Sequence, residues 1–162
     1  MEQAPNNVIS GRIEFHTAVR EALAEAAAEG WQELWLCDAN FADWPLGEAS
    51  VIDSLTQWAQ GPHRLTLLAL NYEEVSRRHA RWVQWRRNWS HSVTCREIQE
   101  LQADDVPSML LAPGVLTLRL MDRVHHRGLV SREPADALHA RELIDAISQR
   151  SVEAFPVTTL GL

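Results

Sequence analysis

The sequence predicts an α/β domain built on a mixed β-sheet that is flanked by helices on both faces. Helix-like and strand-like segments alternate through the first half of the chain, which is typical of a parallel sheet. Residues 64–70 are nearly all apolar, as expected of a strand buried on both faces. Later, the strand-like runs 109–111 and 115–120 meet at Pro113-Gly114, which indicates a hairpin.

The chain has the length and composition of one folded domain. It has 162 residues, of which 46% are hydrophobic and 23% charged, and seven are tryptophans. We expect residues 12–162 to form a single α/β domain. Residues 1–11 are rich in proline, asparagine and glycine, so we expect them to be a flexible N-terminal lead-in.

Each element has its own local signal. Residues 12–29 are Ala-rich and stop at Gly30, which predicts a helix. Residues 33–37 alternate in polarity, as a half-buried strand does, and residues 48–60 carry the apolar spacing of a second helix. The later elements are expected to be a helix over 72–89, a weak strand over 91–98, an acidic turn over 99–105, a third late strand over 124–130 and a helix over 134–149.

Composition excludes several functions. The formal net charge of −7 argues against a nucleic-acid partner or an anionic membrane surface. All 15 basic residues are arginine, so chemistry that requires a lysine is absent from this chain. No apolar run is long enough to span a bilayer and no signal peptide is apparent, so we expect a soluble cytoplasmic protein.

The cysteines predict neither a disulfide nor a metal site. Cys37 and Cys95 lie far apart in apolar or mixed segments, which favours buried reduced thiols. No CxxC spacing occurs, and we predict no metal and no other cofactor. The abundance of arginine and alanine is typical of a GC-rich bacterial genome.

The order of elements, with a late hairpin and a closing helix, resembles one half of a phospholipase D-like domain. In that superfamily the hairpin carries the signature HxKxxxxDxxxxxxGSxN, with a catalytic histidine and a phosphate-binding lysine. Laid on this chain, the signature puts Pro107 at the histidine, Met109 at the lysine and Gly114 at the aspartate. No catalytic residue matches.

The chain also resembles a family of uncharacterised bacterial domains with phrases similar to DANFADWPLGE, RRHARWVQWRR and AFPVTTLGL. These resemblances imply a phospholipase D-like fold without the phospholipase site. Active members combine two motifs, in tandem halves or in a homodimer, so a single half implies a homodimer. The apolar tail, residues 154–162, is expected to dock on the body or on a neighbouring subunit.

Polar residues follow the first two predicted strands. Ligands of open α/β sheets bind beyond the carboxyl ends of the parallel strands, where carboxylates and amides can hold a cation, a sugar or an amine. The alternative is that these residues cap helices and form turns. The candidate ligand-binding residues at these strand ends are Asp38, Asn40 and Asn71, with Asp43 nearby. Arg78 and Arg127 are the candidate clamps for an anionic ligand.

Two other segments suggest a function. His125 and His126 lie close to Asp122, so one of them can act as a general base, although neighbouring residues on a strand point to opposite faces.

The segment RRHARWVQWRRNW, residues 77–89, interleaves arginine and tryptophan, as surfaces that bind single-stranded nucleic acid do. The alternative for the segment is a tryptophan stripe in the core.

The sequence favours a non-catalytic, phospholipase D-like accessory or binding domain. Its expected partner is a second copy of the chain, in a homodimer, or another protein. One alternative is an enzyme acting on a small phosphorylated or anionic substrate, which requires Asp38, Asn71 and His125 or His126 to converge in one cleft. The other is a nucleic-acid-binding module, which requires the arginines of residues 77–87 to be exposed on one face.

Overall fold

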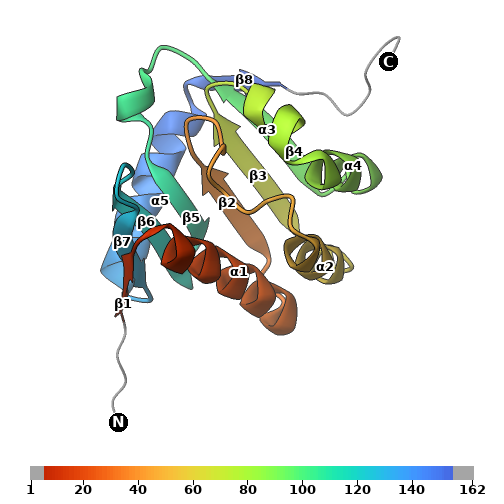
Figure 1. Ribbon diagram of the computed structural model, residues 1–162, viewed down its shortest axis with the longest axis horizontal. Helices are drawn as coiled ribbons and strands as arrows, with labels where there is room; N and C mark the ends of the chain where they lie inside the picture. The colour runs from red at the N-terminus through yellow and green to blue at the C-terminus, as the bar shows by residue number, and fades with distance from the viewer. Residues whose placement is uncertain (1–5, 155–162) are drawn as a thin grey trace.

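The computed structural model describes residues 6–154, whose strands form one eight-stranded sheet (Figure 1). The strand order is β1-β7-β6-β5-β2-β3-β4-β8. The strands are β1 (Asn6–Ser10), β2 (Glu33–Cys37), β3 (Arg64–Ala69), β4 (Val93–Ile98), β5 (Ser108–Ala112), β6 (Leu116–Asp122), β7 (Arg127–Ser131) and β8 (Ser151–Glu153). The helices are α1 (Arg12–Glu29), α2 (Ala49–Trp58), α3 (Glu73–Arg78), α4 (Ala80–Asn88) and α5 (Pro134–Ser148), with a 3₁₀ turn η1 (Ala103–Asp105).

The centre of the sheet is parallel and its flanks are antiparallel. β2, β3 and β4 run parallel, whereas β5 pairs antiparallel with β2. β5 and β6 form the predicted hairpin, and its turn places Gly114 at φ 76°, a left-handed conformation that glycine adopts without strain. The mixed sheet predicted from the sequence is confirmed.

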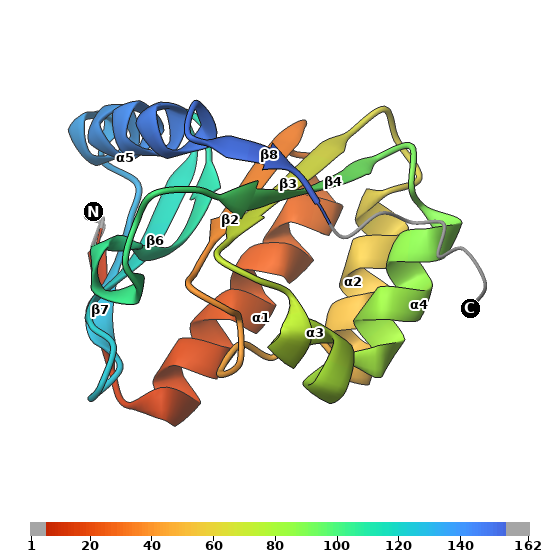
Figure 2. The same ribbon diagram turned by 90° about the horizontal axis from the view of Figure 1, so that it is seen from above.

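Helices cover both faces of this sheet, as the sequence predicts. Figure 2 shows α5 on one side, the sheet in the middle, and α1, α2, α3 and α4 on the other side. The larger core lies beneath α1, α2 and α4, with Phe15, Leu55 and Trp82 almost fully buried. A smaller core lies beneath α5, where Ile144 and Ile147 pack near Met109.

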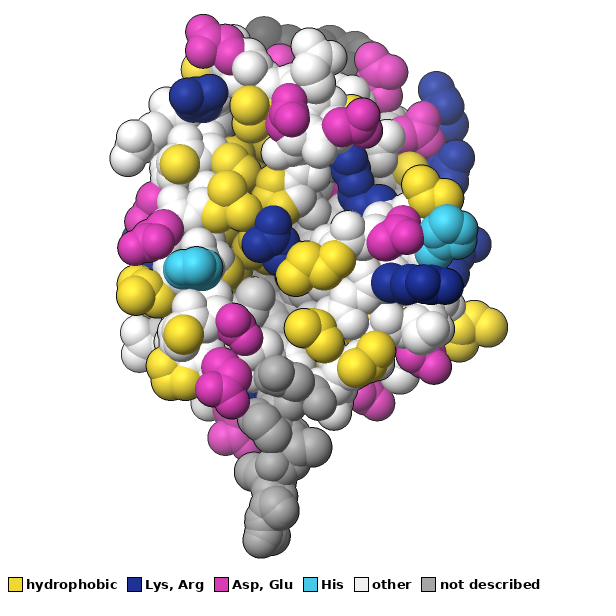
Figure 3. Space-filling model, turned by 90° about the vertical axis from the view of Figure 1, so that its left-hand side faces the viewer, with side chains coloured by type: hydrophobic (Ala, Val, Ile, Leu, Met, Phe, Trp, Pro, Cys, Tyr) yellow, Lys and Arg dark blue, Asp and Glu magenta, His cyan; other side chains and the backbone are white. Residues whose placement is uncertain are grey.

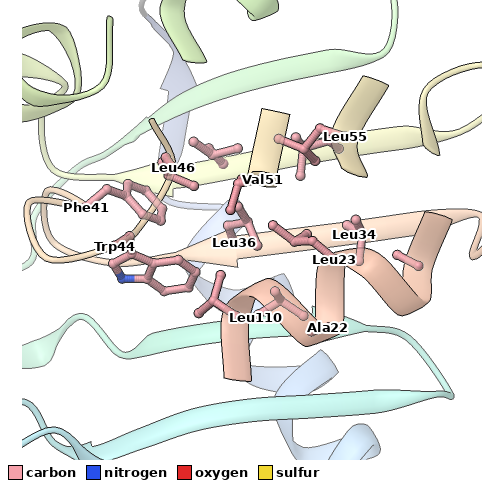
Figure 4. Close-up of a cluster of buried hydrophobic side chains, with 14 of the residues drawn as sticks. Ala22, Leu23, Leu34, Leu36, Phe41, Trp44, Leu46, Val51, Leu55 and Leu110 are labelled. Carbon is pink, nitrogen blue, oxygen red and sulfur yellow. The ribbon is translucent and has the colours of Figure 1, made fainter. Parts of the chain in front are cut away.

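The loop after β2 is part of the larger core. Phe41 and Trp44 point into the cluster of buried side chains shown in Figure 4, together with Leu46 from the same loop. The two aromatic rings meet edge to face, with their centroids 5.1 Å apart. Packing of its own side chains therefore fixes this loop, which carries much of the candidate site.

The sequence-based prediction differs from the structure at both edges of the sheet. Residues 6–10, which we assigned to a flexible lead-in, form β1 and pair antiparallel with β7. They do so because the edge of β7 offers free backbone hydrogen-bonding groups to a segment with little hydrophobic signal of its own. β8 was also not predicted, since it has only three residues. Residues 1–5 and most of the apolar tail, 155–162, lie outside the described residues.

The single helix predicted over residues 72–89 is wrong, because the chain breaks at His79 into α3 and α4. His79 has φ −126° and ψ 53°, outside the helical region. Its Nε2 donates a hydrogen bond to the carbonyl oxygen of Phe41 at 2.8 Å, and the side chain is buried. This contact joins the break to the loop after β2, which a sequence pattern does not reveal.

Candidate functional site

A pocket of about 440 Å³ opens at the carboxyl edge of the parallel strands. β6 ends at the same edge, because β5 runs antiparallel to β2 and β6 antiparallel to β5. The topology therefore gathers residues from α1, the β2 end, the start of β5 and the β6–β7 turn. The pocket is lined by Phe15, Asp38, Ala39, Asn40, Asp43, Trp44, Ala103, Ser108, Leu120, Arg123, Val124 and His126.

Asp38 is the buried organising residue of this pocket. Its Oδ2 accepts backbone hydrogen bonds from Asn40 and Phe41 at 3.1 and 2.8 Å. Its Oδ1 accepts a hydrogen bond from the hydroxyl of Ser108, the first residue of β5. The side chain is only 8% exposed, so these three donors replace the water that a buried carboxylate loses. Asp38 thus shapes the loop that follows β2, as the turn-forming alternative predicts.

A buried aromatic cluster from α1 and the loop after β2 lies beneath the pocket. The rings of Phe15 and Trp44 meet edge to face, with their centroids 5.3 Å apart. The rings of His126 and Phe15 have their centroids 5.8 Å apart. Phe15 and Trp44 are 0% and 3% exposed, so these rings support the pocket from beneath, and the His126 side chain is the more accessible of the three.

The rim carries opposite charges. The carboxylate of Asp43 lies 3.8 Å from the Arg12 guanidinium and 3.9 Å from Nε2 of His126. Arg123 donates to the backbone oxygen of Ala103 at 2.7 Å. Asp43 is exposed, so its carboxylate is accessible to a ligand.

The two histidines of the predicted cluster separate. His126 has a left-handed φ of 54°, and its side chain, 13% exposed, lines the pocket. His125 is exposed and bonds Asp122 through Nδ1 at 2.9 Å. That hydrogen bond holds the pKa of Asp122 below its ordinary value of 3.8. His126 therefore belongs to the pocket, whereas His125 and Asp122 form a separate surface pair.

Of the candidate ligand-binding residues, Asp38 and Asn40 line the pocket and three others do not. The side chain of Asn71 accepts from the backbone of Glu73 at 3.2 Å, at the start of α3. Arg78 pairs with Glu74 one helical turn away. Arg127 lines a separate shallow hollow on the β1–β7 side.

Sequence reasoning missed Phe15, Trp44, Ser108 and Arg123 as lining residues. Phe15 and Trp44 carry an ordinary core signal, because most of each ring is buried in the larger core. Arg123 directly follows β6, so its place at the carboxyl edge could have been found once β6 was known to run parallel to β2. Ser108 has no sequence signal that distinguishes it from other strand residues.

Solved structures resemble this arrangement over nearly the whole chain. TrmBL2, an archaeal chromatin protein, superposes with a TM-score of 0.67 and 13% identity over 93% of this chain and 54% of its own. NucT from Helicobacter pylori has a TM-score of 0.60 and 7% identity over 92% of this chain and 98% of its own. Nuc from Salmonella typhimurium, a phospholipase D family member, has a TM-score of 0.59 and 8% identity over 93% of this chain and 99% of its own. The chain has the phospholipase D-like fold. Its sequence matches no family model and no curated protein.

The arginine and tryptophan segment of this phospholipase D-like domain is largely structural. Trp82 and Trp85 are buried, as the core alternative predicts. Arg86 is also buried and donates to the sulfur of Cys95 at 3.1 Å. Arg77 joins Arg78 in pairing with Glu74. The single exposed arginine face that a nucleic-acid module requires is therefore not formed in full.

Within residues 6–154, no group of three histidine, cysteine, aspartate or glutamate side chains is placed to hold a metal ion. No helix of that part of the chain combines the length and the apolarity that crossing a membrane requires.

Proposed function

We propose that this phospholipase D-like domain is a non-catalytic binding module that takes a small polar ligand in the carboxyl-edge pocket. The observation that carries the proposal is the pocket itself, which gathers donors and acceptors over a buried aromatic cluster at the edge where α/β sheets bind their ligands.

The lining favours a hydroxyl-rich ligand such as a small sugar. Asp43 offers an accessible acceptor, His126 and Arg123 offer donors, and Asn40 offers both. Val124, which lines the pocket and is 82% exposed, supplies an apolar surface for such a ligand. A bare anion or a bare cation would satisfy only half of these groups.

The absence of catalysis is supported by how the reactive groups are used. The Ser108 hydroxyl donates to Asp38, and the Asp38 carboxylate also accepts two backbone hydrogen bonds. An activated serine needs a general base to take its proton, and no hydrogen bond joins Ser108 to His126 in the described residues. The chain also has no lysine to bind a phosphate. The enzyme alternative required Asn71 in the cleft, and Asn71 does not line it.

A thermal-shift screen against sugars, nucleosides, phosphorylated metabolites and divalent metals tests the proposal. A ligand at a hundred times its Kd adds about 2.7 kcal/mol of stability, which such a screen detects. The shift should be lost in Asp43→Asn and kept in Asp53→Asn, which removes an exposed carboxylate of α2. Turnover of a phosphodiester such as bis(p-nitrophenyl) phosphate, abolished by His126→Asn, would overturn the non-catalytic assignment.

A nucleic-acid role is the second candidate, because TrmBL2 is described as a chromatin protein with a novel mode of DNA binding. The net charge of −7 and the burial of Arg86 speak against the same role here. Fluorescence anisotropy with a duplex oligonucleotide at low salt separates the two candidates. Binding that weakens steeply as salt rises would favour the nucleic-acid role.

A homodimer that covers the rim of the pocket is the partner we favour. Ile13 and Val124 are 81% and 82% exposed, and exposed apolar side chains that gather in a patch mark interaction surfaces. Val124 lines the pocket, and Ile13 follows Arg12, whose guanidinium lies 3.8 Å from Asp43 of the pocket. Light scattering should show a dimer that dissociates in Val124→Asp but not in the matched variant Val152→Asp, at the far edge of the sheet.

A further inference from the structure

A second cavity, of about 190 Å³, lies on the opposite face of the sheet, between β6, β7 and α5. Strand alternation produces it: Leu118 and Leu120 point into the larger core, so Thr117, Arg119 and Met121 point the other way. Figure 3 shows the side of the molecule that faces left in Figure 1, where hydrophobic side chains gather and basic side chains lie beside them. The full lining is Thr117, Arg119, Met121, Leu129, Ser131, Asp136, His139 and Ala140.

Two polar groups in this cavity are buried without a partner. Thr117 is 6% exposed, and its Oγ1 makes no hydrogen bond. The Nε of Arg119 is likewise buried and unbonded, and no ion pair joins the Arg119 guanidinium to any carboxylate of the described residues. Buried donors without acceptors cost folding free energy, so native proteins rarely keep them without another use.

The facing wall carries the opposite charge. Asp136, at the start of α5, is held by a hydrogen bond from the Ser131 hydroxyl at 2.6 Å. His139 lies one turn further along the same helix. Arg119 and Asp136 line one cavity yet form no ion pair with each other. The cavity thus combines donors from β6 with a carboxylate from α5, and Met121, Leu129 and Ala140 add apolar lining.

We infer that this cavity binds a small carboxylate that also carries an amine, as a free amino acid does. The ligand carboxylate accepts from Arg119 Nε and the Thr117 hydroxyl, which gives both unpartnered groups an acceptor. The ligand ammonium pairs with Asp136, whose position Ser131 fixes. The volume suits a compact ligand, and the site is separate from the carboxyl-edge pocket, so neither proposal depends on the other.

The melting temperature of the ligand-free protein gives the first test. Groups that serve only binding can be replaced without loss of stability, whereas groups that serve folding cannot. Thr117→Val replaces an unpartnered hydroxyl with a methyl group, and Arg119→Met removes the unpartnered Nε while keeping an apolar stem. Without ligand, both variants should melt at the wild-type temperature or above it. Clear destabilisation by both would mean that the two groups serve the fold, and would overturn the inference.

Binding is tested by NMR titration with glycine, L-alanine and L-leucine at constant ionic strength. Acetate, which has only the carboxylate, and ethanolamine, which has only the amine, serve as partial ligands. The Arg119 Nε signal, assigned by its loss in Arg119→Met, should shift with at least one amino acid, less with acetate and not with ethanolamine. Thr117→Val should raise the fitted Kd about tenfold or more, since a hydrogen bond to a charged group is lost.

The control variants are Asp43→Asn, which alters only the carboxyl-edge pocket, and Arg64→Gln, which removes an exposed arginine of β3. Both should bind the amino acid as the wild type does. No shift with any of the three amino acids, or a shift that survives in both Thr117→Val and Arg119→Met, would overturn the inference.

Discussion

Ser108, the first residue of β5, donates its hydroxyl hydrogen bond to Asp38, which follows the last residue of β2, and both side chains are buried. The two residues are 70 positions apart in the chain. Their contact ties the hairpin to the parallel centre of the sheet. It also holds the carboxylate that shapes the loop through Asn40 and Phe41. The floor of the candidate pocket therefore depends on this pair.

Ser108→Ala should destabilise the domain by about 1–3 kcal/mol, because the buried carboxylate of Asp38 loses one of its donors. Urea denaturation measures the change. Ser76→Ala, at an exposed position of α3, should fall within about 0.5 kcal/mol of the wild type. Equal losses of stability in both variants would show that the Ser108–Asp38 hydrogen bond does not stabilise the domain.

Trp58→Phe should cost about 1–3 kcal/mol more than Trp82→Phe. Both rings are almost fully buried, so the loss of volume is similar. The indole of Trp58 donates to the carbonyl oxygen of Trp31 at 2.6 Å, whereas the Nε1 of Trp82 has no partner. Only the first change leaves a carbonyl group short of a donor. Chemical denaturation measures the free energy of unfolding of the two variants. A larger loss of stability for Trp82→Phe would contradict the assigned hydrogen bonds.

Stability should fall on acidification partly through His79. Burial is the main cause that lowers the pKa of its imidazole below 6.5. A group with a lowered folded-state pKa contributes stability above its unfolded pKa, and that stability is lost as pH falls from about 6.5 through the folded value. Urea denaturation at pH 7.5 and 5.5 should show a larger loss for the wild type than for His79→Gln. His91→Gln, at an exposed site, should behave as the wild type, and any reversal of that order would exclude His79 as the source.

The two thiols should be almost inert in the folded protein. Burial raises the pKa of Cys95 to about 11 and raises that of Cys37 further. At pH 8 about one Cys95 thiol in a thousand is then ionised, and only the thiolate reacts. Reaction with DTNB should be at least about a hundredfold faster in urea than in buffer. Rapid labelling of either thiol in buffer would mean that its strand opens readily.

The central part of the fold follows from local sequence patterns. Residues 33–37 and 64–70 have the alternation and the apolar run of buried strands, and the Pro-Gly turn at 113–114 indicates the hairpin. The edge strands β1 and β8 could not be predicted, because they depend on the free edges of β7 and β4 rather than on their own side chains.

The site was harder to predict than the fold, for a physical reason in each case. Asp38 and Asn40 were found because they end a parallel strand. His126 turns into the pocket through a left-handed backbone conformation that no glycine or asparagine signals. Asn71 also follows a parallel strand, yet its side chain accepts a local hydrogen bond from the backbone of Glu73 and does not line the pocket. Arg78, the expected clamp for an anionic ligand, pairs instead with Glu74 of its own helix.

A ¹H–¹⁵N NMR titration of the domain with the strongest compound from the thermal-shift screen locates the binding site. We expect the shifted signals to cluster in the loop after β2 around Asn40 and Asp43 and in the turn around Arg123 and His126. Asp43→Asn should weaken the response, and Asp53→Asn should not. Shifts confined to other surfaces, or no binding by any compound in the screen, would contradict the assignment of the carboxyl-edge pocket as the binding site.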